Sequence, residues 1–216
     1  MKLKGKEAIV TGGERDMGRS ISEKLEQEGE KVVTNYFENE EDANETLSVV
    51  QKAGSEGIIV QGDMTKAADV KQLFDKAVAA YGSQINALVN VVGGIVGRKL
   101  VTEQDEAWYD FLMDVNMRSV FLCTREAVPY MPEGSTIVNF SSQAARDGGG
   151  PGASMYATAK GSVMTYTRSM DKELGPKGIR VTSLAPGTLA TSFHERFNTP
   201  ANRERLKGMD PLRPAG

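Results

Sequence analysis

Residues 8–25, AIVTGGERDMGRSISEKL, decide the fold of this chain. The apolar run Ala8–Val10 is typical of a short buried strand, and it ends at the glycine-containing turn Thr11–Gly13. Apolar residues then recur every four positions from Met17 to Leu25, and Gly29 ends this helical spacing. The stretch therefore predicts a strand, a glycine turn and a helix in succession.

The same unit recurs along the chain. Apolar runs predict further strands at Lys31–Tyr36, Gly57–Val60, Ala87–Val92, Thr136–Phe140 and Ile179–Leu184. Amphipathic spacing predicts helices at 40–52, 70–81 and about 103–131, and another around Tyr156. Almost continuously apolar strands that alternate with such helices favour a Rossmann-type doubly wound parallel sheet, a three-layer α/β/α sandwich. Ligands bind such sheets at the carboxyl ends of the strands, so functional residues are expected in the loops that follow strands.

Length, charge and cysteine content narrow the class of protein. The 216 residues suit one domain, 1–216, since single cores usually split beyond about 250 residues. A net charge of -3 gives no general reason to expect nucleic acid or an anionic membrane as a partner. The longest apolar run, 85–96, is too short to span a bilayer, and the N-terminus has no signal-peptide pattern. The single cysteine, Cys123, is expected in the core, so we expect a cytoplasmic protein without a disulfide or a metal site.

The turn from Thr11 to Gly18 follows the first strand and opens the first helix. In this context glycines such as Gly12 let backbone N–H groups and the helix N-terminus approach a pyrophosphate. A glycine-rich turn alone is weak support, but this one is the first strand-to-helix turn of a doubly wound pattern. We therefore predict that a dinucleotide cofactor binds here.

The end of the second strand indicates which dinucleotide binds. An acidic side chain at this position accepts the ribose hydroxyls of NAD and repels a 2′-phosphate. Here the strand ends Thr34-Asn35-Tyr36-Phe37 without an acid, and Arg15 in the turn supplies a cation that could pair with the phosphate. NADP(H) is therefore preferred over NAD(H), although Arg15 as a solvated surface charge remains the alternative.

Tyr156 and Lys160 are four residues apart and project from one face of the predicted helix, about 5 to 6 Å apart at Cβ. A neighbouring ammonium favours the phenolate, so the tyrosine proton becomes available for transfer near neutral pH. The same spacing also arises by chance where an aromatic ring packs under a solvated lysine. The assignment therefore depends on the motifs around it.

The ordered set of these motifs resembles the short-chain dehydrogenase/reductase family from end to end. The turn 11–18 is similar to the family's Thr-Gly-x-x-x-Gly-x-Gly motif, and Asn90-Val91-Val92-Gly93 stands where the family has Asn-Asn-Ala-Gly. The resemblance implies four catalytic residues: Asn116, Ser142, Tyr156 and Lys160. It implies cofactor contacts at Gly12, Arg15, Met17, Gly18, Tyr36, Asp63, Asn90, Gly93, Tyr156, Lys160, Pro186, Gly187 and Thr191.

The resemblance also implies an activity, the reversible reduction of a small-molecule ketone or aldehyde. Tyr156 would give a proton to the developing alkoxide, and Ser142 would hydrogen-bond the carbonyl oxygen. Lys160 would lower the pKa of Tyr156 and reach the nicotinamide ribose, while Asn116 would hold a water behind Lys160. The family's usual assembly is a homotetramer. A non-catalytic nucleotide-sensing protein, or an epimerase or dehydratase on the same scaffold, remains an alternative.

Three departures from the family pattern bear on these expectations. Asp16 occupies the position of the middle glycine, where a carboxylate would repel the pyrophosphate unless it turns back as N-cap of the helix from Met17, which we expect. Val91 and Val92 replace an asparagine and an alanine without loss of a catalytic group. The family's last helix and strand are expected to be absent from 1–216.

Arg98 and Arg146 flank the presumed substrate pocket. Cations near a carbonyl site suit an anionic substrate, such as a keto or uronic sugar acid or a 3-oxoacyl thioester on a carrier. A solvated rim is the alternative for both arginines. The polar segment 192–206 resembles the family's mobile lid over the substrate.

Overall fold

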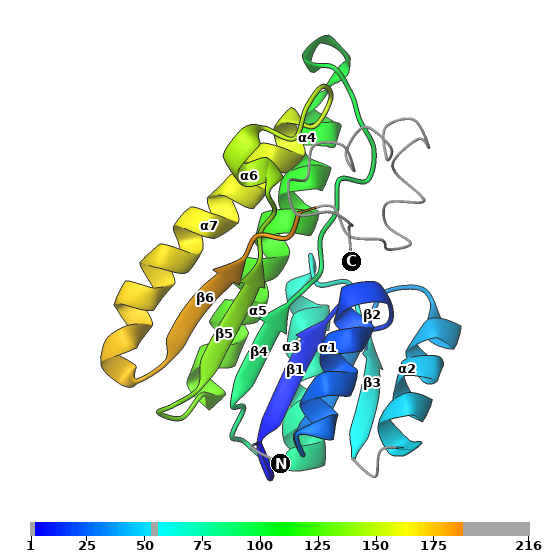
Figure 1. The fold of residues 1–216 in the computed structure, drawn as a ribbon, viewed down its shortest axis with the longest axis vertical. Coiled ribbons are helices and arrows are strands. Elements are labelled where there is room, and N and C mark those ends of the chain that lie inside the picture. The colour runs from blue at the N-terminus through cyan, green and yellow to red at the C-terminus, as the bar shows by residue number, and fades with distance from the viewer. Residues whose placement is uncertain (1–2, 53–55, 188–216) are drawn as a thin grey trace.

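The computed structural model describes residues 3–52 and 56–187, which form one sheet with helices on both faces (Figure 1). The sheet contains β1 (Glu7–Thr11), β2 (Lys31–Tyr36), β3 (Gly57–Gln61), β4 (Ala87–Asn90), β5 (Thr136–Phe140) and β6 (Arg180–Leu184). The strands lie in the order β3-β2-β1-β4-β5-β6, and every neighbouring pair is parallel. The predicted doubly wound parallel sheet is therefore confirmed.

The helices connect successive strands. They are α1 (Asp16–Gln27), α2 (Glu40–Lys52), α3 (Ala67–Tyr81), α4 (Glu106–Met113), α5 (Ser119–Ala127), α6 (Ala144–Asp147) and α7 (Ser154–Leu174). Short 3₁₀ turns occur at η1 (Val101–Glu103), η3 (Val128–Tyr130) and η4 (Gly175–Lys177), and a π-helical turn, η2, spans Asp114–Arg118. The carboxyl ends of the strands lie along the upper edge of the sheet in Figure 1, beneath α4 and α6.

Alternation along β1 divides the core between the two faces of the sheet. Successive strand side chains point to opposite faces, so Ile9 packs in one cluster with Phe74 of α3 and Leu174 of α7. Ala8 and Val10 pack in a second cluster, against Ile21 of α1. Two apolar clusters on opposite faces of one sheet give the predicted three layers.

The long helix predicted at about 103–131 is present as a continuous helical stretch from Glu106 to Tyr130, but a π-helical turn interrupts its regular spacing. It begins at Glu106 because the Asp105 carboxylate accepts a hydrogen bond from the Trp108 backbone N–H at 2.8 Å and caps its first turn. The π-helical turn η2 then separates α4 from α5 around Asn116. Tertiary contacts of Asn116, described below, hold this turn, and helical periodicity does not reveal them.

Strand β4 ends at Asn90 rather than at the predicted Val92. The backbone N–H groups of Val91 and Val92 point to the Thr11 hydroxyl, at 3.2 and 3.4 Å, instead of extending the ladder with β5. Smaller differences occur at β6, which begins at Arg180 instead of Ile179, and at α3, which begins at Ala67. The early end of β4 lets the loop after it turn across the carboxyl edge of the sheet.

Cys123 lies in the core, as predicted, with no exposed surface. Its burial raises the pKa of the thiol to about 12, so the group stays protonated at neutral pH. Within residues 3–52 and 56–187, no helix combines the length and apolar character needed to cross a membrane.

Candidate active site

The glycine turn brings the start of α1 against the end of β1. A Cβ atom on Gly18 would lie 2.0 Å from the carbonyl oxygen of Gly12, which is far inside van der Waals contact. Gly12 itself has a φ of 63°, in the left-handed region that glycine adopts without strain. The main chain can therefore come as close to a pyrophosphate as the sequence predicted for Gly12, Met17 and Gly18, and the first-turn N–H groups of α1 lack intrahelical acceptors by geometry.

Asp16 does not cap α1, contrary to expectation. The N-cap position belongs to Arg15, and Asp16 is the first helical residue, with a φ of 49°. That conformation is the one the family's glycine would adopt, and a carboxylate there lies in the first turn of α1. A favourable interaction with the helix dipole therefore opposes the strain of the left-handed conformation. Arg15 is exposed, as a residue that meets a phosphate from solvent must be.

Asn35 organises the cofactor side of the sheet, and the sequence reasoning gave it no role. Its side-chain oxygen accepts a hydrogen bond from Gly12 N–H at 3.3 Å, and its amide nitrogen donates to Gly62 O at 3.0 Å. A buried amide near the end of a strand, next to the predicted cofactor position, could have suggested this function. The contacts tie the glycine turn after β1 to the end of β3.

A cavity of about 540 Å³ opens beside this asparagine at the ends of β2 and β3. Its lining includes Tyr36, Phe37, Glu40, Asp63 and Lys76. The volume suits a small organic group such as a nucleoside, so the predicted cofactor residues Tyr36 and Asp63 share one recess. The Asp63 carboxylate also accepts hydrogen bonds from Thr65 N–H and its hydroxyl, at 2.9 and 2.7 Å, which fixes its orientation.

Ser142 and Tyr156 meet at the carboxyl end of β5. Ser142 follows β5, and its hydroxyl oxygen accepts a hydrogen bond from Ala144 N–H at 3.1 Å. Tyr156 lies in the first turn of α7, where burial raises the pKa of its phenol and a hydrogen bond with Ser142 partly lowers it again. The structure thus brings these two predicted catalytic residues together in hydrogen-bonding contact.

Lys160 lies one turn further along α7 and is 3% exposed. Its ammonium donates a hydrogen bond to Phe140 O at 2.8 Å, and burial lowers its pKa to about 8. The causes of the Tyr156 pKa shift are burial and Ser142, so the tuning of Tyr156 by Lys160 stays a prediction. Lys160 can hold or release a proton near neutral pH beside the catalytic hydroxyls.

Gly93 makes room for Lys160. A Cβ on Gly93 would lie 2.6 Å from Lys160 Nζ and 2.7 Å from Asn116 Oδ1, and its φ of 145° also favours glycine. The loop after β4 therefore passes directly over the ammonium. Only a glycine fits at this position of the loop, because Lys160 and Asn116 already pack against its backbone.

The Asn116 side chain is occupied by backbone contacts. Its oxygen accepts from Gly94 N–H at 2.9 Å, and its nitrogen donates to Gly94 O and Leu112 O, both at 3.0 Å. Asn116 is fully buried. The side chain thus ties the loop after β4 to helix α4, which is the structural role that the sequence left open as the alternative for Asn116; the predicted water relay stays a prediction.

Asn90 lies within the sheet. It is 1% exposed, and its amide nitrogen donates to Asn139 Oδ1 at 2.8 Å, whose own amide nitrogen reaches the Thr167 hydroxyl at 3.0 Å. This chain of hydrogen bonds links β4, β5 and α7 beneath the catalytic residues. The Asn90 side chain therefore faces the interior, whereas Gly93 of the same motif faces the site.

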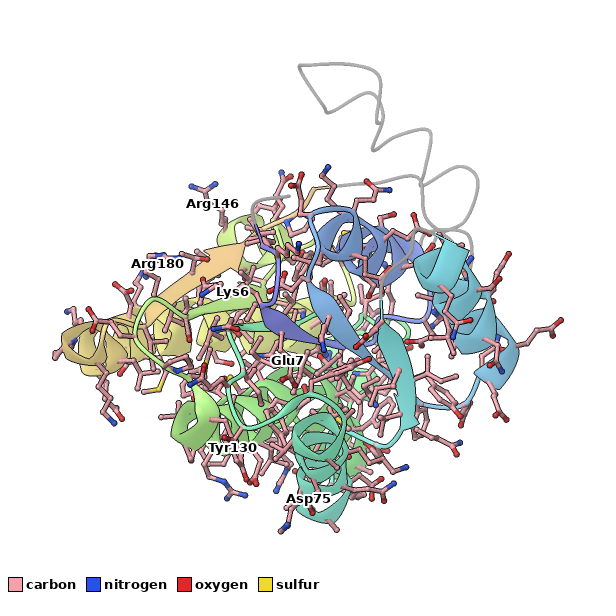
Figure 2. All side chains as sticks on the ribbon, turned by 90° about the horizontal axis from the view of Figure 1, so that it is seen from below. Lys6, Glu7, Asp75, Tyr130, Arg146 and Arg180 are labelled. Atoms are coloured by element: carbon pink, nitrogen blue, oxygen red, sulfur yellow. The ribbon has the colours of Figure 1, made fainter. Side chains whose placement is uncertain are left out.

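The two predicted substrate-binding arginines have different surroundings. Arg98 Nη1 donates to the carbonyl oxygens of Gly149 and Pro151, at 3.1 and 2.9 Å, and so holds the glycine-rich loop before α7. Arg146 is exposed on α6, and Figure 2 shows its side chain extending outward from the molecule. The structure does not bring the two guanidinium groups together.

The segment after β6 returns to the start of α6. Gln143 N–H donates to Pro186 O at 3.0 Å, so Pro186 and Gly187 lie next to the loop that carries Ser142. Thr191 and the predicted lid at 192–206 lie outside the described residues.

Comparisons with known proteins place the chain among enzymes of one kind. The sequence model of the short chain dehydrogenase family matches residues 6–202. The short chain dehydrogenase/reductase nsrJ of Aspergillus novofumigatus is 34% identical over 222 residues, which cover 98% of this chain and 83% of that protein.

Two solved structures resemble the fold closely. A short chain dehydrogenase from Burkholderia cenocepacia J2315, in complex with NADP, has a TM-score of 0.93 at 27% identity and covers 100% of this chain and 86% of its own. The NADH-dependent reductase A1-R′, complexed with NAD, has a TM-score of 0.82 at 33% identity and covers 87% of this chain and 80% of its own. Structures similar to this chain thus hold either nicotinamide cofactor.

Proposed function

The chain belongs to the short-chain dehydrogenase/reductase family of NAD(P)-dependent oxidoreductases, and we propose that it reduces a ketone or aldehyde to an alcohol with NADPH. The observation that carries this proposal is that Ser142, in the loop after β5, and Tyr156, at the start of α7, meet one helical turn from the buried ammonium of Lys160. A hydroxyl pair beside a proton-holding cation is what reduction of a carbonyl oxygen requires.

The chain's own groups act on the carbonyl oxygen. The Ser142 hydroxyl donates a hydrogen bond to that oxygen and fixes the carbonyl beside the Tyr156 phenol. As the carbonyl carbon gains a hydride, the oxygen gains negative charge, and Tyr156 passes its proton to it. When bound, the nicotinamide supplies the hydride and is oxidised. The product alcohol thus gains one hydride on carbon and one proton on oxygen, which balances the reaction.

Lys160 favours this proton transfer. As Tyr156 gives up its proton, the nearby ammonium stabilises the phenolate that forms. The pKa of about 8 for Lys160 means that the amine is partly protonated at neutral pH. We propose that Lys160 Nζ turns from Phe140 O toward the nicotinamide ribose when the cofactor binds.

We propose NADP(H) as the preferred cofactor. The cavity at the ends of β2 and β3 has Tyr36 and Phe37 where an NAD enzyme would carry an acid, and Arg15 is exposed at the start of α1. Glu40 lines the same cavity and opposes a 2′-phosphate. The preference therefore depends on Arg15, and its removal is expected to weaken NADPH binding and leave NADH binding unchanged.

We further propose an anionic carbonyl substrate, a cytoplasmic location and a homotetramer. The first rests on the place of Arg146 in the sequence, four residues after Ser142, since Arg98 already binds loop carbonyls. Exposed aromatic rings on α4 and α5, with Phe111 at 47% and Phe121 at 41%, support assembly. Light scattering of the purified protein measures the assembly directly, and a monomer at micromolar concentration would contradict it.

The experiment that tests the activity is a panel of neutral and anionic ketones and aldehydes, each incubated with NADPH and with NADH. We expect oxidation of NADPH with one alcohol formed per cofactor consumed, and higher kcat/KM for the anionic members. Net consumption of cofactor separates a reductase from an epimerase or dehydratase, which returns its cofactor unchanged. A folded protein that oxidises neither cofactor with any member would contradict the proposal.

A further inference from the structure

Arg19 of α1 lies between the glycine turn and α2. Its guanidinium makes several hydrogen bonds to backbone and side-chain groups, which a solvated surface charge does not need. Its Nε and Nη2 atoms donate to Glu14 O at 3.2 and 3.0 Å, and Nη2 also donates to Asp42 O at 3.0 Å. Nη1 lies 2.8 Å from a Glu45 carboxylate oxygen. The Arg19 side chain is 24% exposed, so these contacts are largely shielded from water.

Thr46 of α2 completes this cluster. Its hydroxyl accepts a hydrogen bond from Arg19 Nε at 2.9 Å, and its single proton has two acceptors, Glu14 O at 2.9 Å and Asp42 O at 3.1 Å, of which Glu14 O is the nearer. Thr46 has no exposed surface. Three donors, two from Arg19 and one from Thr46, therefore converge on the single carbonyl oxygen of Glu14.

A fixed carbonyl fixes the rest of its peptide unit. In a trans peptide the C=O of residue 14 and the N–H of residue 15 lie in one plane and point in opposite directions. Because the Glu14 carbonyl points toward Arg19 and α2, the Arg15 N–H points to the opposite side of the turn. Glu14 is followed by the strained Asp16, so without this constraint the peptide units between β1 and α1 would have several conformations open to them.

We propose that Arg19 and Thr46 are positioning residues for the cofactor: they hold the Glu14 peptide so that the turn presents its N–H groups to the pyrophosphate. The inference rests on the proposed nicotinamide cofactor but assigns residues outside the family motif. The pyrophosphate is common to NADPH and NADH, so the two cofactors depend equally on this cluster. The Arg15 side chain, in contrast, is expected to bind only the 2′-phosphate of NADPH.

The test compares Arg19→Gln, Thr46→Val and Thr46→Ser with the wild type in the full chain. The Thr46 pair is matched, since valine keeps the shape and serine keeps the hydroxyl, and neither changes the charge. Lys24→Gln is the control, because Lys24 is a cation on the same helix that pairs at 3.2 Å with Glu28, away from the turn. Arg15→Gln serves as the comparison for a residue specific to NADPH.

Three quantities are measured: the Kd of NADPH and of NADH by fluorescence, the free energy of unfolding, and amide hydrogen exchange of the 12–18 peptide without cofactor. We expect Arg19→Gln to raise both Kd values by about tenfold or more, equivalent to about 1.4 kcal/mol, with an unchanged ratio between them. Thr46→Val should raise both by a few fold and Thr46→Ser should change neither. Exchange in the turn should be faster in Arg19→Gln and Thr46→Val and unchanged in Lys24→Gln.

Several results would overturn the proposal. Thr46→Val with wild-type affinities and wild-type exchange in the turn would show that the cluster only joins α1 to α2. Arg19→Gln that weakens NADPH alone would make Arg19 a direct ligand of the 2′-phosphate. If the wild type bound neither cofactor, the proposed function would fail instead, and hydrogen exchange in the turn would still decide the positioning role.

Discussion

Two buried groups near the carboxyl ends of the strands, on Lys160 and Asn116, are hydrogen-bonded differently from two buried carboxyls at the amino ends, on Glu7 and Glu30. At the carboxyl edge, the buried amine of Lys160 donates to Phe140 O, and the buried amide of Asn116 makes three hydrogen bonds. At the amino edge, Glu7 and Glu30 are each 3% exposed, and within the part of the chain that the structure describes one oxygen of each lacks a hydrogen-bond partner. Figure 2, seen from below, shows Glu7 in the middle of this edge.

The pKa values of these buried groups differ accordingly from their ordinary values. Burial raises the pKa of both Glu7 and Glu30 to about 7, so these carboxyls are largely protonated in the folded state below neutral pH. At the carboxyl edge the same burial lowers the pKa of Lys160 to about 8, which suits proton transfer. Burial of Lys160 therefore favours proton transfer at the carboxyl ends of the strands. Burial of Glu7 and Glu30 at the amino ends makes the stability of the fold depend on pH.

The largest expected effect is that of Gly93→Ala, which would break the order at the carboxyl edge. The new methyl group would collide with Lys160 Nζ and Asn116 Oδ1. We expect kcat/KM for the carbonyl to fall about 100-fold, a loss of about 2.7 kcal/mol of transition-state stabilisation. Gly161→Ala is the control, because a Cβ at this position of α7 meets no atom within 4 Å. Normal turnover of Gly93→Ala would show that the site tolerates the displacement of Lys160.

The next effect concerns Glu7 at the amino edge. The unfolded chain titrates this carboxyl near its ordinary value of 4.5 and the folded chain near 7, so between these pH values only the unfolded state loses the proton. Stability is therefore lost as the pH rises through this window, by about 2 to 3 kcal/mol for Glu7. Denaturant unfolding at pH 5 and pH 8 should show a smaller difference for Glu7→Gln than for the wild type.

The control for Glu7 is Glu56→Gln. Glu56 is a carboxylate that is 70% exposed and pairs with Lys31, which also lies near Glu7. This variant should keep the wild-type pH dependence, because it leaves the burial of Glu7 unchanged. An equal pH dependence in Glu7→Gln and the wild type would mean that burial at this edge does not control the titration.

The smallest effect is expected at Asp16, a carboxylate that stands near the predicted pyrophosphate site where the family has a glycine. Asp16→Asn keeps a residue that tolerates the left-handed conformation and removes the charge, whereas Asp16→Gly also removes the strain. Both should tighten NADPH binding by about three- to tenfold, since a negative charge leaves the first turn of α1. Only Asp16→Gly should gain about 0.5 to 1 kcal/mol of stability beyond Asp16→Asn. Unchanged NADPH binding in both variants would show that the carboxylate points away from the phosphates.

The sequence was sufficient for features that depend on local pattern. The apolar strands, the glycine turn and the spacing of Tyr156 and Lys160 on one helix are periodic or local, and the structure has them. It brings Ser142 to Tyr156 because the carboxyl end of β5 and the start of α7 meet at one edge of a parallel sheet. Topology thus predicted where this part of the site lies, and the family resemblance indicated Ser142 within it.

The features that pattern could not predict depend on contacts between distant segments. The π-helical turn within the long predicted helix lies where Asn116 binds Gly94, 22 residues away. Arg98 binds carbonyls 51 and 53 residues away, so its charge could not be distinguished from that of a substrate ligand. The contacts of Arg19 likewise depend on how α2 packs beside α1, which the spacing of residues in the sequence does not predict. The prediction that Asp16 is the N-cap was wrong, because α1 begins one residue earlier than its apolar spacing indicates.

The central claim is that Tyr156 is the proton donor of a carbonyl reductase, and Tyr156→Phe tests it most directly. The variant keeps the ring and removes only the hydroxyl, so NADPH should bind with a Kd within about twofold of the wild type. We expect kcat/KM with the best carbonyl substrate to fall at least about 100-fold. Reduction at a substantial fraction of the wild-type rate, with NADPH binding intact, would contradict the account.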